Sequence, residues 1–216
     1  MTSTLTHQAR IIISAVVVMG VLAMNAHAVE EAAYEVRLKE DRFELRDYEP
    51  QLVAEILVDG TMQEAGNRAF GSLYRYIAGD NQPRDRVAMT APVSQRRAGE
   101  TIAMTAPVGQ QAVGDQWAVS FMMPASYTME TLPVPDHPDI VIRERPAQRV
   151  AAVRYAGRWS EKNYHRHKVA LQQWIESQGW DVIGETVWAR YNAPFVPAFM
   201  RRNEILIPVS TTQPDS

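Results

Sequence analysis

Short segments in which apolar and polar residues alternate are separated along the chain by two longer segments with helical periodicity. Alternation over four to eight residues, bounded by Gly, Pro or polar clusters, is typical of strands with one buried face. On this criterion we expect strands at Phe43–Arg46, Leu52–Val58, Trp117–Met123, Ile140–Arg143, Val150–Tyr155, Val187–Tyr191 and Glu204–Val209. These short, closely spaced runs favour antiparallel pairing.

The first helical segment spans residues 62–78. Its apolar side chains fall on one continuous arc about 180° wide when the chain is wound at 3.6 residues per turn. Phe70 and Tyr74 lie at the rim of this arc, and Arg68 and Arg75 lie on the opposite face. The pattern predicts an amphipathic helix whose rim carries two aromatic rings.

The second helical segment spans residues 161–178. Ser160 is a typical N-cap residue, and Gly179 is well placed to end the helix. Its buried stripe is predicted to consist of Tyr164, His167, Leu171, Trp174 and Ile175.

Two internal repeats organise the chain. Val87–Val93 returns as Ile102–Val108 with six of seven letters unchanged, and each copy is typical of an edge strand that ends at a proline. A weaker repeat aligns Phe43–Gly60 without gaps on Ile140–Gly157, each copy being two strands that lead into a helix. The predicted fold class is α+β: a distorted antiparallel β-barrel of two pseudo-symmetric halves with two flanking helices.

The first 28 residues are predicted to be a cleaved signal peptide. Arg10 is followed by an apolar run, Ile11–Met24, and by Ala26–Ala28, which fits the small-x-small cleavage pattern. The alternative is an uncleaved anchor, but this run is shorter than the ~20 residues of a spanning helix. We therefore expect a single domain over residues 29–216, exported to the periplasm and without an integral membrane span.

Charge and cysteine content narrow the classes of function. The formal net charge is −3, and removal of residues 1–28, whose one charged side chain is Arg10, makes it −4. This balance argues against nucleic acid as a partner. The chain has no cysteine, which excludes disulfides, thiolate metal sites and covalent heme attachment.

Several motifs in the second half of the chain and its centre resemble the SOUL heme-binding protein family. They are the doubled Ala-Met-Thr-Ala-Pro-Val, Val119–Pro124, Tyr127–Pro135, Arg190–Phe195 and Arg201–Glu204. The resemblance covers Tyr34–Val209 and implies the two-half barrel described above. It also implies non-covalent binding of heme or another tetrapyrrole in a cleft beside the first helix. The fold is similar to that of bacterial effector-binding domains, which hold small hydrophobic ligands.

The resemblance also indicates which residues hold the ligand. Heme requires an apolar slot for its ring and cations for its propionates. Where animal members of the family use an arginine and two methionines on the first helix, this chain has Asn67, Phe70 and Tyr74. The family's helical lysine corresponds to Arg75, and a second lysine corresponds to Val196. Asn67, Phe70, Tyr74 and Arg75 are therefore the candidate heme-binding residues. The alternative is that Phe70 and Tyr74 only widen the buried face.

Three histidines follow the signal segment. His165 and His167 point about 160° apart on a helix and so cannot share a metal ion, and we expect no metal site. His167 falls on the buried stripe, where a hydrogen-bonded core residue is expected. His165 is a solvent-facing residue and a weak candidate axial ligand, whereas His137 belongs to a turn.

The methionines of the doubled motif allow two interpretations. Met89 and Met104 lie at the apolar phase of their strands, where methionine usually fills a core. The alternative is that one of them is a soft ligand of heme iron.

Motifs of enzymes are missing from the sequence, which has no G-x-S-x-G turn, phosphate-binding glycine loop or dinucleotide fingerprint. We expect an exported heme- or tetrapyrrole-binding protein that acts as a carrier, buffer or sensor and is not an enzyme. Its protein partners are undetermined. One alternative is a binding module for another hydrophobic small molecule in the same cleft. A small hydrolase is the other, and it would need Glu55, Glu144 or Glu185 in that cleft.

Overall fold

The computed structural model describes residues 29–84 and 99–210. The expected signal peptide and the first copy of the doubled motif, Val87–Val93, lie outside these residues. Neither helix in the described part of the chain is long and apolar enough to cross a membrane.

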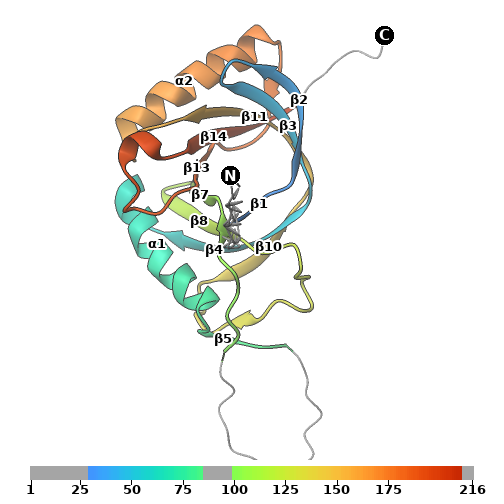
Figure 1. Ribbon diagram of the computed structural model, residues 1–216, viewed down its shortest axis with the longest axis vertical. Helices are drawn as coiled ribbons and strands as arrows, with labels where there is room; N and C mark the ends of the chain where they lie inside the picture. The colour runs from blue at the N-terminus through green and yellow to red at the C-terminus, as the bar shows by residue number, and fades with distance from the viewer. Residues whose placement is uncertain (1–28, 85–98, 211–216) are drawn as a thin grey trace, which may run out of the picture.

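A ten-stranded antiparallel sheet curls into a half-barrel, and two helices pack on it (Figure 1). Its strands follow the order β10-β4-β8-β7-β13-β14-β11-β3-β2, and β12 pairs with β14. Their bounds are β2 Tyr34–Glu40, β3 Phe43–Tyr48, β4 Gln51–Val58, β7 Val108–Val113, β8 Gln116–Met122, β10 Val141–Arg145, β11 Gln148–Tyr155, β12 Asp181–Val182, β13 Val187–Arg190 and β14 Asn203–Ser210. Two small pairs and a short 3-10 helix complete the described chain: β1 Glu30–Glu31 with β6 Thr105–Ala106, β5 Asn81–Gln82 with β9 Val134–Pro135, and η1 Ala198–Met200. The predicted α+β class is confirmed.

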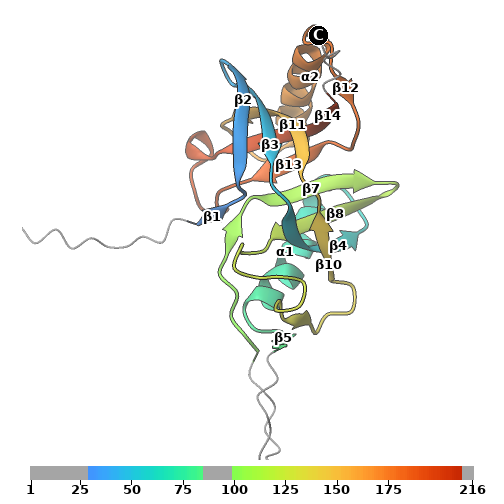
Figure 2. The same cartoon turned by 90° about the vertical axis from the view of Figure 1, so that its right-hand side faces the viewer.

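The weaker sequence repeat is confirmed as a structural repeat. The order β10-β4-β8-β7 in one half corresponds to β3-β11-β14-β13 in the other, and the halves meet where β7 pairs with β13. The strand register repeats as well, because Arg143 pairs with Val53 and Arg46 pairs with Val150. The first strand of each repeat thus pairs with the second strand of the other. This exchange interlocks the two repeats: in the side view of Figure 2, β3 lies beside β11 in the upper part and β10 beside β4 in the lower part.

Both predicted helices form close to their expected bounds. α1 spans Met62–Ile77 and starts with a capping box in which the side chains of Thr61 and Glu64 bind each other's backbone amides. α2 spans Glu161–Ser177, with Ser160 as its N-cap as expected. Gly179, at a φ of +71°, follows the helix in a left-handed conformation that glycine adopts without strain.

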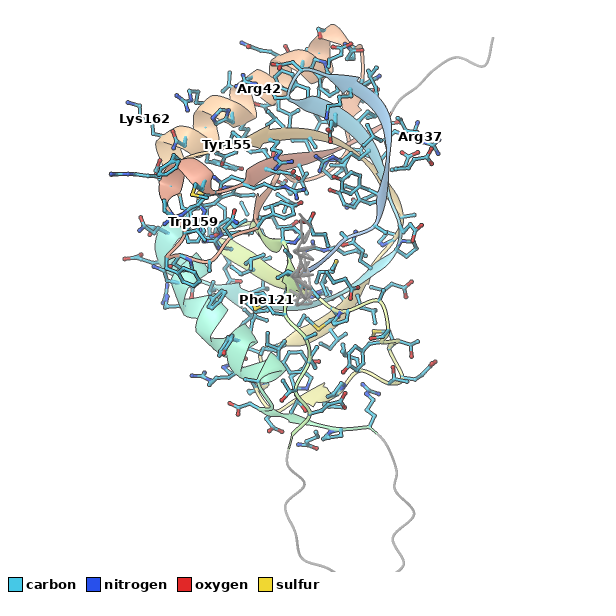
Figure 3. All side chains as sticks on the ribbon, viewed as in Figure 1. Arg37, Arg42, Phe121, Tyr155, Trp159 and Lys162 are labelled. Carbon is cyan, nitrogen blue, oxygen red and sulfur yellow. The ribbon has the colours of Figure 1, made fainter. Side chains whose placement is uncertain are left out.

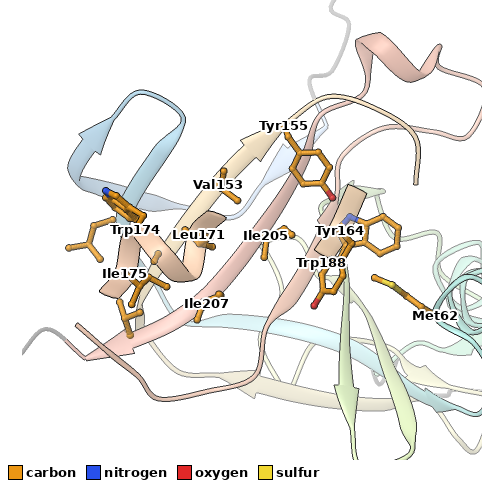
Figure 4. Packing of buried hydrophobic residues seen from close by; sticks show 13 residues of the cluster. Met62, Val153, Tyr155, Tyr164, Leu171, Trp174, Ile175, Trp188, Ile205 and Ile207 are labelled. Carbon is orange, nitrogen blue, oxygen red and sulfur yellow. The ribbon is translucent and has the colours of Figure 1, made fainter. Parts of the chain in front are cut away.

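Two hydrophobic clusters form the core, one beneath each helix. The cluster beneath α2 joins Leu171, Trp174 and Ile175 to the inner faces of β11 and β14, as Figure 4 shows. It includes the whole predicted stripe of α2 except His167, which is buried beside it. The cluster beneath α1 contains Leu73 and packs on β4 and β8. Each helix is therefore held mainly by its apolar face.

The second copy of the doubled motif does not form the continuous strand that its pattern predicts. β6 covers only Thr105–Ala106 and pairs in parallel with β1, and β7 begins at Val108. Pro107 separates the two because it has no N–H to donate to a ladder. The Thr105 hydroxyl donates to the carbonyl oxygen of Met122, which ties this irregular segment to the sheet.

Candidate functional site

A cleft with a volume of about 320 Å³ opens beside α1. It is lined by α1, by the segment that leads into β7, and by residues 190–194 at the end of β13. Phe70, Met104, Trp159 and Tyr191 contribute side chains to a lining in which apolar groups predominate. Figure 3 shows Trp159 between the adjoining ends of α1 and α2. The structure therefore has a largely apolar cleft beside α1.

Phe70 joins this cleft to the core. Its ring packs edge-on against Phe121 at a centroid distance of 5.3 Å and is half-buried. Tyr74 lies nearly parallel to Phe70, with centroids 6.1 Å apart, but is 52% exposed and does not line the cleft. Phe70 thus widens the buried face and also lines the cleft, whereas Tyr74 extends the aromatic surface toward solvent.

The two polar candidates on α1 lie in different places. Asn67 is exposed and lines the cleft. Arg75 is not among the lining residues, and its guanidinium lies 3.8 Å from the carboxylate of Asp80 and bonds weakly to Ser72. The structure therefore brings together Asn67 and Phe70, but not Arg75, at the cleft.

Arg190 is the cation that the structure places at this cleft. The side chain is 9% exposed, and its Nη2 donates to Oε1 of Gln110 over 3.2 Å. Gln110 in turn donates to the carbonyl oxygen of Met62 in the first turn of α1. The guanidinium carbon lies 5.1 Å from the ring centroid of Trp188 and 5.3 Å from that of Trp159. These contacts fix the guanidinium between the sheet and the start of α1.

The charge of Arg190 has no matching acid. Within residues 29–84 and 99–210, no carboxylate forms an ion pair with it and its Nε has no hydrogen-bond partner. Burial lowers the pKa of Arg190 to about 10, although the nearby Tyr155 acts in the opposite direction. The side chain therefore stays charged at neutral pH, in a place where an isolated charge is costly.

Gly66 allows α1 to approach Arg190. A Cβ atom at this position would lie 2.8 Å from Nη2 of Arg190 and 2.9 Å from Oε1 of Gln110. A glycine in a helix interior costs about 1 kcal/mol relative to alanine, and close packing against the guanidinium explains its presence here.

Two features of the sequence could have indicated the role of Arg190 and Gly66, which the sequence analysis did not predict. Arg190 lies two residues after Trp188 in the same strand, so both side chains point to the same face of β13. A buried arginine at such a position indicates a special role, as does Gly66 on the buried arc of a helix.

Comparison with known families assigns the chain. A family model described as SOUL heme-binding protein matches residues 29–208. The chain belongs to the SOUL family. Among curated proteins, no significant match to the sequence is found.

Solved structures share the fold of this SOUL protein. The crystal structure of the EcmrR C-terminal domain aligns with a TM-score of 0.56 and 11% identity, over 82% of this chain and 98% of that one. A hydrolase from Listeria innocua aligns with a TM-score of 0.50 and 13% identity, over 81% of this chain and 94% of that one. At these identities the likeness establishes the fold alone.

Met104 is a correction to the sequence analysis. The interpretation as core filler is wrong, because Met104 is 37% exposed and lines the cleft of the SOUL protein. Its strand pattern is misleading, because Met104 precedes β6 and lies outside any strand. Met104 is therefore the soft sulfur donor that the described residues place at the cleft, whereas Met89 lies outside them.

The histidines occupy the environments expected of them. His167 is buried and stacks on Tyr155 with ring centroids 4.0 Å apart. Its Nε2 lies 3.2 Å from Nη2 of Arg166, but its buried Nδ1 has no hydrogen-bond partner among the described residues, so the expected hydrogen bonding is only partly met. His165 is exposed on α2 and does not line the cleft, so the structure does not support it as an axial ligand. His137 lies in a turn, where its Nδ1 accepts from the amide of Asp139. In the described ranges, no group of three His, Cys, Asp or Glu residues is arranged to hold a metal ion.

None of the three carboxylates considered for the hydrolase alternative lines the cleft beside α1. Glu55 forms ion pairs with Arg143 and Arg145, at 3.0 Å and 3.3 Å. Glu144 lines a separate hollow, and neither it nor Glu185 is among the residues that line the cleft beside α1. Among residues 29–84 and 99–210, no carboxylate lines the cleft beside α1.

Proposed function

We propose that this SOUL protein binds heme or a related tetrapyrrole non-covalently in the cleft beside α1. The observation that carries the proposal is an apolar cleft, lined by aromatic side chains and one buried cation, in a member of a heme-binding family. A flat apolar ring with acidic side chains matches this combination.

Phe70 is proposed to contact the ring face or edge, with Asn67 beside it on the same helix. Tyr74 extends the aromatic surface beyond the cleft, and Arg75 lies where it can meet a group that projects into solvent. The cleft residues fit a ligand held mainly by contact. An axial bond to the iron is optional in this proposal. If one forms, the sulfur of Met104 would supply it. Binding without such a bond would suit a carrier or buffer, which must release its ligand.

A hemin titration followed in the Soret band tests the proposal. We expect saturation near one equivalent, with affinity lowered about tenfold or more by Phe70→Ala, because the ring loses its main aromatic contact. Met129→Ala is a matched control, since it removes an exposed apolar side chain that lies by another hollow. Shallow binding without saturation, or equal effects of the two substitutions, would contradict the proposal.

Two variations extend the same titration. Met104→Leu keeps the side-chain volume but removes the sulfur, so a shifted Soret maximum would assign that sulfur to iron. If hemin does not bind but flat hydrophobic compounds raise the melting temperature, the cleft serves a different ligand, as the alternative from the sequence holds.

We propose further that the protein works outside the cytoplasm. The pattern of residues 1–28 supports this, with a basic start, an apolar run and a small-x-small site. Cell fractionation and the mass of the mature N-terminus test it. A chain that begins at Val29 in the periplasmic fraction is expected, whereas an intact N-terminus in the membrane fraction would show an anchor instead.

A further inference from the structure

A second cleft, also of about 320 Å³, adjoins the one beside α1. The two share Asn67, Trp159 and Arg190 in their linings, so a single ligand can occupy both. Arg158 and Arg201 line the second cleft together with Arg190. We call it the basic cleft, because three arginines and no acidic residue line it among the described parts of the chain.

The three guanidinium groups remain without a matching acid. In residues 29–84 and 99–210, no carboxylate forms an ion pair with Arg158, Arg190 or Arg201. Arg201 instead donates to the carbonyl oxygens of Val196 and Pro194, over 2.7 Å and 2.6 Å. Carbonyl oxygens hold this guanidinium in place without neutralising it. The cleft therefore has a net positive charge in the protein itself.

Trp159 organises the cluster. The guanidinium carbons of Arg190 and Arg201 lie 5.3 Å and 4.5 Å from the centroid of its ring. Its indole Nε1 donates to Oδ1 of Asn203 over 2.8 Å, which fixes the plane of the ring. Cation–π contacts hold each arginine against the ring without cancelling its charge. The arrangement orders two cations before any ligand arrives, which lowers the entropy lost on binding.

The buried and unpaired charge of Arg190 is the strongest indication that the basic cleft binds a ligand. A side chain with 91% of its surface covered has lost most of its hydration, yet its Nε has no hydrogen-bond partner in the described residues. Buried charges in proteins are almost always paired. Arg190 lines both clefts, and so it stands where the acidic group of a bound molecule would meet it.

We propose that the basic cleft binds a carboxylate of the ligand whose apolar body lies in the cleft beside α1. The ligand class is then a flat amphipathic carboxylic acid, and for a tetrapyrrole the acidic groups are its propionates. The identity of the ring rests on the proposed function. The new element is that Arg190 and its neighbours bind the free acid in preference to an uncharged form of the same ligand. Arg75, on the exposed face of α1, is not needed for this selection.

A comparison of hemin with its dimethyl ester tests the proposal, because the two have the same ring and differ in charge. Titrations in one low-detergent buffer should show the ester binding about ten- to a hundredfold more weakly, as expected for the loss of charge-assisted hydrogen bonds. Arg190→Gln should lower the affinity for hemin to that for the ester, and it should leave the affinity for the ester unchanged. Arg154→Gln, an exposed arginine of β11, is the matched control and should keep the preference for the acid.

The possible outcomes separate this proposal from the proposed function. If hemin and its ester bind equally and Phe70→Ala weakens both, the basic cleft does not select the acid although the ring site stands. If Arg190→Gln fails to fold, Arg201→Gln on the more exposed side of the cleft provides the same comparison.

If neither tetrapyrrole saturates, a fluorescent aromatic fatty acid and its methyl ester replace them. Binding of the acid alone, lost in Arg190→Gln, would keep the basic cleft and reject the tetrapyrrole. Equal binding or no binding of that pair would overturn the inference.

Discussion

Two buried arginines, Arg46 and Arg190, meet opposite environments in this protein. Arg46 is 2% exposed and lies 2.7 Å from a carboxylate oxygen of Glu204 and 2.7 Å from one of Glu44. Glu204 is fully buried and also accepts from Tyr191 and Arg202, each over 2.9 Å. Burial opposes the charge of Arg46, but the bond to Glu204 outweighs it and raises the pKa of Arg46.

Arg190 shows what the same side chain looks like without such partners. Burial lowers its pKa, and in the described residues its neighbours are the side-chain amide of Gln110 and two tryptophan rings. The paired arginine ties β3 to β14, two strands that both pair with β11, and so it stabilises the fold. The unpaired one adds a desolvation cost that the fold does not recover, which is characteristic of binding sites.

The largest expected effect comes from breaking the ion-pair network of Arg46 with Glu44 and Glu204. Arg46→Met should lower the free energy of unfolding by about 3 kcal/mol or more, because Glu204 keeps its charge in a buried place with one partner fewer. Urea unfolding measures the loss. Arg37→Met is the control, since this arginine pairs with Asp47 at the surface and should contribute under about 1 kcal/mol. Similar small losses in both variants would mean that Arg46 is no more structural than a surface residue.

The next largest effect is the pH dependence of the free energy of unfolding that arises from His167. Burial lowers the pKa of His167 to about 4, with help from the charges of Arg166 and Arg42, and its ring stacks on Tyr155. The unfolded chain binds this proton near pH 6.5, so stability present above that pH is lost as pH falls toward 4. We expect a loss of about 2 kcal/mol between pH 7 and pH 5 in urea unfolding.

Substitutions separate this effect from other titrations. His167→Gln should flatten the slope between pH 7 and pH 5, whereas His165→Gln, on the exposed side of α2, should keep it. The carboxylates that pair with Arg46 titrate at lower pH, because the pKa of Glu204 and that of Glu44 are both lowered. Their contribution is therefore lost only below the unfolded value of about 4.5. An unchanged slope in His167→Gln would show that another group is responsible.

A smaller effect tests the close approach of α1 to Arg190. Gly66→Ala should destabilise the protein by about 1 kcal/mol, because the new methyl group displaces Arg190 and Gln110. It should also lower hemin affinity. Gly71→Ala on the same helix has no atoms within 4 Å of its new Cβ and should stabilise by about 0.5–1 kcal/mol. If both alanines stabilise equally, Arg190 is not held against α1 as the structure shows.

Most of the architecture could be predicted because periodicity and repeats report directly on it. The apolar arcs gave the bounds of both helices to within a residue, and Ser160 and Gly179 marked the ends of α2. The alignment of Phe43–Gly60 on Ile140–Gly157 anticipated the repeated register. β2 was missed although its apolar and charged residues alternate. Most of β7 was missed because Gly109, Gln110 and Gln111 interrupt the alternation of apolar and polar residues there.

The site was predictable only in part, because it is formed by segments distant in sequence. The first helix and its resemblance to the family pointed to Asn67 and Phe70, which do line the cleft. No local pattern indicates that Arg190 and Trp159 lie against that helix, because their approach depends on the pairing of β13 with β7. Arg75 matched a family position but points to another partner, Asp80.

The smallest expected effect decides how the two arginines differ. Arg190→Met should leave the free energy of unfolding within about 1 kcal/mol of the natural chain, because relief of the buried charge offsets the lost bond to Gln110. Urea unfolding beside Arg46→Met measures the contrast, and hemin affinity is measured on the same samples. A loss as large as that of Arg46→Met would make Arg190 a structural residue. Unchanged stability with weakened hemin binding would instead show that the fold bears this unpaired charge for the ligand.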